Sequence, residues 1–159
     1  KTASDLNVKP AYINELVERI LKRVRPIAAR RNIQVVFASF RPVTAEVDEV
    51  KLSLAISNLV ENAIKYNKED GWVHVSLNAD HKYFYVKVAD SGIGIPKEDL
   101  PRIFERFYIV DKSRTSKSTG LGLAIVKHIV KLFNGEIFVE SEVGKGSKFT
   151  VISKNVYCE

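Results

Sequence analysis

The chain has 159 residues, of which 45% are apolar and 28% are charged, and its formal net charge is +6. This is typical of one globular domain with a sizeable core, and no apolar run approaches the roughly 18 residues needed to span a membrane. The single cysteine, Cys158, rules out an internal disulfide and a thiolate metal cluster, so a reducing cytosol is the simplest setting.

The basic residues are spread along the chain, which fits an anionic ligand or an acidic protein partner as well as nucleic acid. The sequence has no aromatic-plus-basic platform of the kind that single-strand binders use, and we expect no nucleic-acid partner. The chain contains no Met and begins at Lys1, after which an initiator Met is not usually removed. We therefore expect a fragment of a longer protein.

The first part of the chain predicts one long helix between short strands. Apolar residues recur at helical spacing over residues 11–31, Pro10 suits the first turn, and Pro26 would kink or shorten the helix. Basic side chains on its polar side, with Arg30 and Arg31 at its end, are interpreted as a solvated face. The expected strands are residues 6–9, 33–37 and 43–47.

The next predicted helix, residues 48–66, has an unusual polar face. Asn58, Asn62 and Lys65 share that face, with Tyr66 at its edge. Asn is a poor helix former, so two of them one turn apart indicate either a solvated face that tolerates Asn or a polar floor for a ligand. In the second case the amide oxygens suit a hard cation and the ammonium suits an anion. The opposite side is typical of a core face and consists of Leu52, Ile56, Leu59, Val60 and Ala63.

The rest of the chain predicts antiparallel hairpins and one more long helix. The expected elements are strands 72–77 and 83–89, a short helix within 97–106, a loop over 107–119, a helix from about 120 that ends at 134–135, and strands 136–140 and 148–152. Mixed helices and hairpins predict one sheet covered by helices on one face, an α+β or α/β two-layer sandwich.

Two glycine-rich stretches are candidate ligand sites. Asp90 ends a strand just before Gly92 and Gly94, where a flat ligand can lie against bare backbone and the carboxylate can accept from an exocyclic amine. Residues 118–123 lead into a helix, whose free N–H groups and dipole favour phosphates. This second stretch is neither a Walker loop nor a dinucleotide fingerprint. The alternative explanation is a tight turn for the first stretch and a glycine-rich helix start for the second.

Taken together with the Asn and Lys face, these stretches predict a nucleoside triphosphate site. The base would lie against the first glycine turn, a metal on an Asn, and the phosphates at the helix N-terminus. Four ordered stretches also resemble family motifs: residues 58–66 an N box, 90–96 a first glycine box, 103–108 an F box and 119–127 a second glycine box. Residues 144–147 match the last glycine turn of the same family. Over residues 6–150 the chain resembles the catalytic and ATP-binding domain of bacterial sensor histidine kinases, in the superfamily of gyrase-, chaperone- and mismatch-repair-type ATPases.

The resemblance implies ATP and Mg²⁺ as ligands and assigns roles to residues. Asn62 would hold Mg²⁺, Asn58 would support the metal and phosphates, and Lys65 would reach a phosphate. Tyr66 would pack against the adenine, and Asp90 would accept a hydrogen bond from its amino group. The remaining expected nucleotide contacts are Gly92, Gly94, Ile95, Phe107, Tyr108, Thr119, Gly120, Leu121, Gly122, Leu123 and Thr150.

The resemblance also implies a mixed, mostly antiparallel sheet of the Bergerat type and one domain over residues 1–159. This domain would transfer the ATP γ-phosphoryl group to a histidine on an upstream dimerisation domain, and a response regulator would act next in the pathway. His74, His81 and His128 do not match the phospho-acceptor setting and are interpreted as structural or surface residues. We expect the fragment to be monomeric, without membrane contact of its own, and the cytosolic part of a membrane-anchored bacterial sensor.

Two positions depart from the family pattern. Ile109 stands where the F box has an Arg, and Ser118 replaces the first Gly of the second glycine box. Lys112, Arg114 or Lys117 could substitute for the missing Arg. The alternative prediction is therefore a degenerate nucleotide-binding or docking module without efficient transfer. A gyrase-type hydrolase is disfavoured because Asn58 stands where those enzymes carry an acidic residue, and the F box disfavours the related serine kinases.

Overall fold

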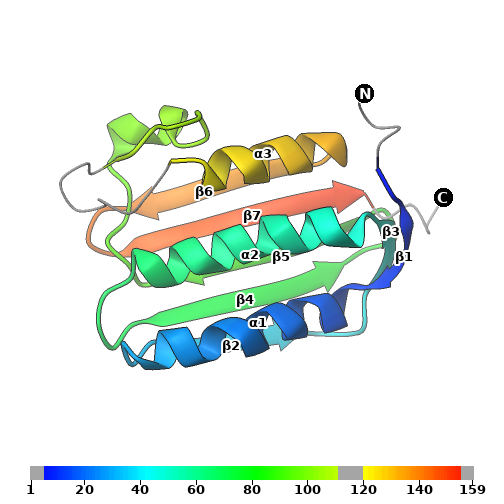
Figure 1. The fold of residues 1–159 in the computed structure, drawn as a ribbon, viewed down its shortest axis with the longest axis horizontal. Coiled ribbons are helices and arrows are strands. Elements are labelled where there is room, and N and C mark those ends of the chain that lie inside the picture. The colour runs from blue at the N-terminus through cyan, green and yellow to red at the C-terminus, as the bar shows by residue number, and fades with distance from the viewer. Residues whose placement is uncertain (1–5, 111–119, 155–159) are drawn as a thin grey trace.

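The structure is a computed structural model that describes residues 6–110 and 120–154. A five-stranded sheet has the order β2-β4-β5-β7-β6, and the helices cover one of its faces (Figure 1). Only the β2–β4 pair is parallel in this sheet, which confirms the predicted mixed, mostly antiparallel architecture. The strands are β2 (Gln34–Ser39), β4 (Trp72–Ala79), β5 (Tyr83–Asp90), β6 (Glu136–Glu142) and β7 (Gly146–Lys154).

Helix α2 (Glu49–Lys65) lies between α1 (Ile13–Ala29) and α3 (Gly122–Leu132) on the sheet (Figure 1). The predicted apolar side of α2 is buried, with Leu52, Leu59 and Val60 at most 1% exposed. Strands β4 and β5 meet it with alternate side chains, because successive residues of a strand point to opposite faces. The predicted core face of this helix is therefore confirmed.

The start of the chain differs from the prediction. Residues 6–8 are not a strand; β1 is Lys9–Tyr12 and pairs antiparallel with β3 (Thr44–Val47) in a separate small sheet. Pro10 lies in this strand, and α1 begins only at Ile13, whose N–H donates to the Val43 carbonyl at 2.9 Å. The helical pattern from residue 11 was misleading because pairing with a strand more than thirty positions away fixes these residues.

Pro26 neither ends nor shortens α1 at that point, because the helix continues to Ala29. Val24 and Ala28 on either side of it are completely buried. Burial of these side chains offsets the hydrogen bond that a proline removes from the helix.

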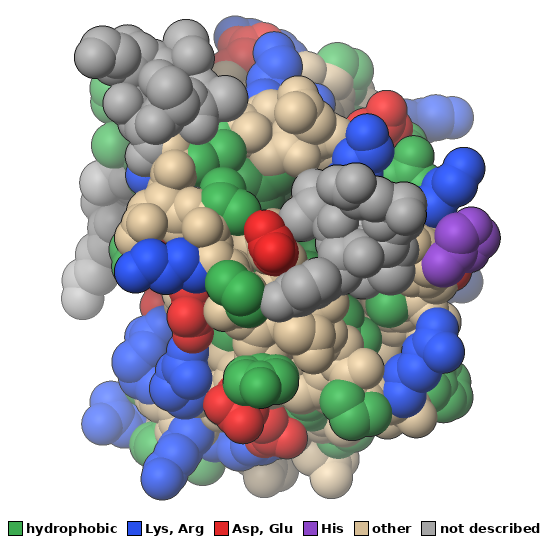
Figure 2. Space-filling view, turned by 90° about the vertical axis from the view of Figure 1, so that its right-hand side faces the viewer, with side chains coloured by type: hydrophobic (Ala, Val, Ile, Leu, Met, Phe, Trp, Pro, Cys, Tyr) green, Lys and Arg blue, Asp and Glu red, His purple; other side chains and the backbone are tan. Residues whose placement is uncertain are grey.

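Figure 2 shows the end of the molecule that carries β1, β3 and the first turn of α2. Basic side chains occur at separate places on this face, with acidic and apolar side chains between them. The exposed apolar side chains of these elements include Tyr12 and Val50, at 63% and 79% exposure. Within the described ranges, no helix is both long enough and apolar enough to cross a bilayer.

The opposite end of the sheet brings helix termini together. Helix α2 ends there and α3 begins there (Figure 1). The side-chain amide of Asn58 in α2 donates to the carbonyl of Gly122 at 3.3 Å and joins the two helices. On the sheet below, β5 and β7 place Asp90 directly opposite Ser147. Three of the predicted motifs therefore meet at this end of the fold.

Candidate nucleotide site

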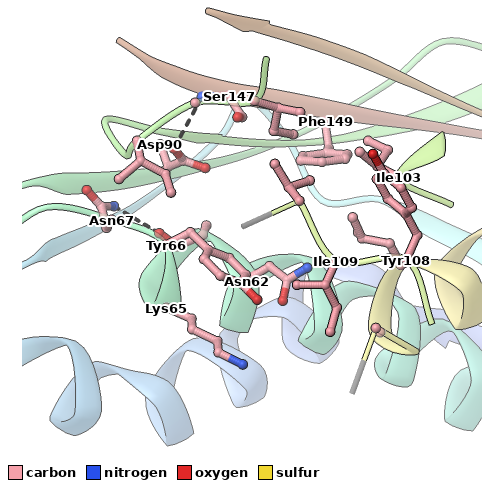
Figure 3. Close-up of a pocket in the computed structure, with 18 of the residues that line it drawn as sticks. Asn62, Lys65, Tyr66, Asn67, Asp90, Ile103, Tyr108, Ile109, Ser147 and Phe149 are labelled. Carbon is pink, nitrogen blue, oxygen red and sulfur yellow. Dashed lines mark hydrogen bonds between the residues drawn. The ribbon is translucent and has the colours of Figure 1, made fainter. Parts of the chain in front are cut away.

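A cavity of about 270 Å³ lies between the end of α2, the β5 and β7 strands and the start of α3 (Figure 3). This volume is close to the lower end of the usual range for small-molecule sites. The residues that the sequence predicts for the site and that line this cavity are Asn62, Lys65, Tyr66, Asp90, Gly94, Ile95, Tyr108, Gly120, Gly122 and Leu123.

Several other predicted site residues lie around the cavity without lining it. Asn58 holds the start of α3, as described above. Gly92 packs against the backbone of Tyr66, where a Cβ would come within 2.4 Å of the Tyr66 carbonyl oxygen. Phe107 is 69% exposed, Leu121 precedes the first residue of α3, and Thr119 lies outside the described residues.

Thr150 is the one predicted residue whose strand position turns it away from the cavity. It follows Phe149, which is buried and lines the cavity. Successive side chains of a strand alternate between faces, so the Thr150 side chain lies on the face of β7 without helices. The expected nucleotide contact of Thr150 is therefore wrong. The residue of β7 that lines the cavity in its place is Phe149, two positions after Ser147.

Asp90 is held at the end of β5 by two backbone groups. Its Oδ1 accepts from the N–H of Gly92 at 2.8 Å and from the N–H of Ser147 at 3.2 Å. Figure 3 shows the bond to Ser147. Within the described residues Oδ2 has no such partner and remains able to accept from a ligand in the cavity. Burial raises the pKa of the Asp90 carboxyl above its ordinary value of 3.8, and the two backbone N–H groups only partly oppose this effect.

The raised pKa of Asp90 predicts a pH-dependent stability. The folded chain binds this proton more tightly than the unfolded chain, so the resulting stabilisation is full below about pH 3.8 and is lost as the pH rises through the folded pKa. We expect the unfolding free energy of the wild type, minus that of Asp90→Asn, to fall across this window and then stay constant. Urea unfolding from pH 3.5 to pH 7, read by circular dichroism, measures it. A difference that rises with pH would contradict the prediction.

The turn after α2 contains a buried residue that sequence reasoning missed. Asn67 is 4% exposed, and its Nδ2 donates to the carbonyls of Ala63 at 2.9 Å and Trp72 at 3.0 Å. Its Oδ1 accepts from the Ser91 hydroxyl at 3.0 Å. Asn67 thereby ties the end of α2 to the turn that follows Asp90. The sequence predicts only an ordinary turn residue at this position, and no local pattern indicates that Asn67 joins two elements.

Ser147 is a second residue that the sequence analysis did not assign. It lines the cavity beside Asp90, and its hydroxyl lies 2.7 Å from that of Ser141 in β6. The Ser141 hydroxyl also accepts from the N–H of Ile95, at 2.8 Å. These bonds hold the glycine turn that follows β5 against the hairpin of β6 and β7. The available signal was that residues 144–147 match the last glycine turn of the family.

The other wall of the cavity comes from the F-box region. The short helix expected within residues 97–106 is present as the 3-10 helix η2 (Lys97–Arg102). Its Asp99 accepts a hydrogen bond from the Tyr108 hydroxyl, which raises the pKa of Tyr108, and Arg102 lies over the Tyr108 ring at 4.4 Å. Ile109 lines the cavity on the side of Asn62 (Figure 3).

The start of α3 is open toward the cavity. Gly122 lines it, a Cβ at this position would meet no described atom within 4 Å, and the side chain of the N-cap residue, Leu121, makes no capping hydrogen bond. The free N–H groups and positive dipole end of this 11-residue helix therefore remain for an anion. Gly120 has a φ of +72°, and its carbonyl accepts from the Phe107 N–H at 2.8 Å. This bond joins the F-box end to the helix start.

The donor groups suit a nucleotide with a hard cation. One end of the cavity offers a carboxylate acceptor beside bare backbone, the wall is apolar, and the other end offers Asn62, Lys65 and helix N–H groups. The described residues contain no cluster of three or more His, Cys, Asp or Glu side chains able to hold a metal. A divalent cation here would therefore take the Asn62 amide oxygen together with phosphate oxygens and water, as Mg²⁺ does in phosphate sites.

A mixed sheet with helices on one face and this cavity at its end define a nucleotide-binding domain. Residues 47–155 match the family described as histidine kinase-, DNA gyrase B-, and HSP90-like ATPase, and the chain belongs to this family. That membership and the sheet topology confirm the resemblance and the fold class expected from the sequence.

Two bacterial sensor proteins and one solved structure illustrate what the chain is similar to. It is 44% identical over 114 residues to sensor histidine kinase WalK of Bacillus subtilis, covering 69% of this chain and 19% of that protein. It is 39% identical to the phosphate regulon sensor protein PhoR of Pseudomonas aeruginosa, covering 89% of this chain and 32% of that protein. Full-length ShkA in complex with AMPPNP has a TM-score of 0.84 and 30% identity, covering 95% of this chain and 32% of that one. The chain thus spans about a fifth to a third of these proteins.

Proposed function

We propose that the chain is the ATP-binding catalytic domain of a two-component sensor histidine kinase. It would place the γ-phosphoryl group of ATP for transfer to a histidine on a separate dimerisation domain. The observation that carries this proposal is the meeting of Asp90, Asn62, Lys65 and the open start of α3 in one cavity. The similarity to WalK and PhoR supports the kinase assignment over the other activities of the family.

The base end of the site is assigned to Asp90 and Tyr66. Oδ2 of Asp90 accepts a hydrogen bond from the adenine amino group, while Oδ1 stays on the backbone of Gly92 and Ser147. Tyr66 lies beside the base, and the wall of Ile95 and Phe149 excludes water from it. An aromatic and aliphatic wall with one oriented acceptor is the usual composition of a small-molecule site.

The phosphate end is assigned to α2 and the start of α3. Asn62 holds Mg²⁺ through its amide oxygen, and Asn58 supports the metal and phosphates from one turn earlier. Lys65 reaches a phosphate, and backbone N–H groups from Thr119 to Leu123 cradle the chain of phosphates. The bound Mg²⁺ neutralises charge on the transferring phosphoryl group.

Catalysis by this domain consists of positioning and charge neutralisation. Asn58 cannot act as a general base for water, which disfavours hydrolysis by the domain itself. His74, His81 and His128 are all exposed, and none of them lines the cavity. The accepting histidine is therefore assigned to an upstream dimerisation domain of the parent protein, with a response regulator as the next partner. The parent is proposed to be a membrane-anchored bacterial sensor with this domain in the cytosol.

Phosphoryl transfer to the parent hairpin domain tests the proposal directly. The chain is mixed with that domain, Mg²⁺ and radiolabelled ATP. We expect acid-labile phosphate on a histidine of the hairpin, and its loss with Asn62→Ala, which removes the proposed metal ligand. Tight binding of Mg-ATP without any transfer would exclude the kinase assignment.

Ile109 favours a second candidate, a nucleotide-binding or docking module without efficient transfer. An isoleucine in the cavity beside Asn62 cannot stabilise charge on a phosphoryl group. In the same assay, Ile109→Arg is compared with Val110→Arg, because Val110 also lines the cavity. A gain of about tenfold or more that is confined to position 109 would identify a weakened kinase. Unchanged ATP binding and no transfer by either variant would identify the docking module.

A further inference from the structure

Arg31, which the sequence places on a solvated helix face, lies at the wall of the cavity. It follows the C-cap of α1 and points across to the end of α2. Its Nη1 donates to the carbonyls of Ile64 at 2.6 Å and Lys65 at 3.3 Å, and its Nη2 donates to the carbonyl of Asn67. A single guanidinium thus satisfies carbonyls on both sides of Tyr66.

Two of these carbonyls, those of Ile64 and Lys65, belong to the last turn of α2, where a helix has no intrahelical donors left for its carbonyls. The Ile64 carbonyl also accepts from the Asn67 N–H at 3.3 Å. The two carbonyls also carry the negative end of the helix dipole, which a guanidinium stabilises. The Arg31 side chain is 32% exposed and is oriented by Glu69 at 2.9 Å. Its fork is planar and fixed, so it sets the relative positions of the carbonyls that it binds.

The backbone of the same region reinforces this contact. The Arg31 carbonyl accepts from the Asp70 N–H at 3.2 Å, and the Asn32 side chain donates to Asp70 at 2.7 Å. The end of α1 and the turn after α2 are therefore joined by backbone and side chains together. Lys65 and Tyr66, which the proposed function assigns to a phosphate and to the adenine, lie inside the segment that Arg31 fastens.

We propose that Arg31 is a positioning residue of the nucleotide site, acting on ATP through Lys65 and Tyr66. This inference rests on the proposed function, because it takes ATP as the ligand of the cavity. It gives Arg31, which directly follows the C-cap of α1, a role that its neighbour Arg30 lacks. Arg30 is exposed and makes no side-chain hydrogen bond within the described residues.

Binding of Mg-ATP to this chain tests the proposal with Arg31→Gln, Arg31→Lys and the matched control Arg30→Gln. The two glutamine variants lose the same charge from adjacent positions. We expect Arg31→Gln to weaken binding about tenfold and Arg30→Gln to stay within about twofold of the wild type. Arg31→Lys keeps the charge but cannot reach three carbonyls, so we expect a loss of at least about threefold.

Titration calorimetry measures these affinities. The temperature is chosen from thermal unfolding curves so that each variant is folded. Hydrogen exchange supplies a readout that a general loss of stability would not give. We expect faster exchange confined to amides 65–70 in Arg31→Lys and no change there in Arg30→Gln. If Arg31→Gln fails to fold, Arg31→Lys still decides the question.

The outcomes separate this inference from the proposed function. Failure of the wild type to bind Mg-ATP would overturn both. Binding by the wild type and by Arg30→Gln, together with equal binding by Arg31→Lys, would overturn only the role of Arg31. Uniformly faster exchange across the sheet would also overturn it, because a positioning residue acts locally.

Discussion

Gly146→Ala is expected to destabilise the chain by about 3 kcal/mol or more, because this position combines strained backbone with no space for a side chain. Gly146 has a φ of +127°, and a Cβ there would lie 2.0 Å from the carbonyl oxygen of Asp90. The methyl group can fit only if β7 moves away from β5. The Ser147 N–H would then leave the Asp90 carboxylate, so ATP binding should fall together with stability.

Gly144→Ala is the matched control in the same hairpin. Gly144 also has a positive φ, of +85°, but a Cβ there would meet nothing within 4 Å. Its cost is therefore backbone strain alone, about 1 kcal/mol. Urea unfolding of both variants measures the difference. Equal destabilisation would mean that the contact with Asp90 is not what requires a glycine at 146.

Asp90→Asn is expected to weaken ATP binding by about 10- to 100-fold while leaving the fold intact, because a charged hydrogen bond contributes about 1.5–3 kcal/mol. The asparagine oxygen can keep both bonds to Gly92 and Ser147. Its amide nitrogen then takes the place of Oδ2 and presents a donor to the adenine amino group. Two donors facing each other cannot bond, and calorimetric titration with Mg-ATP measures the loss.

Inosine triphosphate provides the internal control for Asp90→Asn. Its base carries a carbonyl oxygen where adenine has the amino group, so the new amide can donate to it. We expect the ratio of ATP to inosine triphosphate affinity to fall steeply in the variant, because the phosphate contacts are the same in both nucleotides. A parallel loss for both nucleotides would contradict the assignment of Asp90 to the base.

Local sequence patterns located the helices and strands of the sheet well. The alternation in β4 and β5 and the apolar side of α2 reflect burial on one face, which each segment shows by itself. The polar side of α2 and the two glycine-rich stretches could also be recognised from the sequence, because their residue types are unusual for a helix face, a strand end and a helix start. The first strand was placed three residues too early, at 6–9, because the residues of β1 are extended only through pairing with β3.

The sequence by itself determined which motifs the chain carries, and hence the class of ligand. The residues of a motif such as 58–66 are close together in the chain, so their types and spacing indicate the chemistry of the ligand without knowledge of the fold. Only the tertiary structure decided which further residues serve those motifs. Arg31 and Asn67 are 36 positions apart, Asn67 and Ser91 are 24 apart, and Ser147 and Asp90 are 57 apart. Their contacts depend on how α1 lies against α2 and how β7 pairs with β5. No periodicity within one segment contains that information, so a basic residue on a polar helix face could not be distinguished from its solvated neighbour.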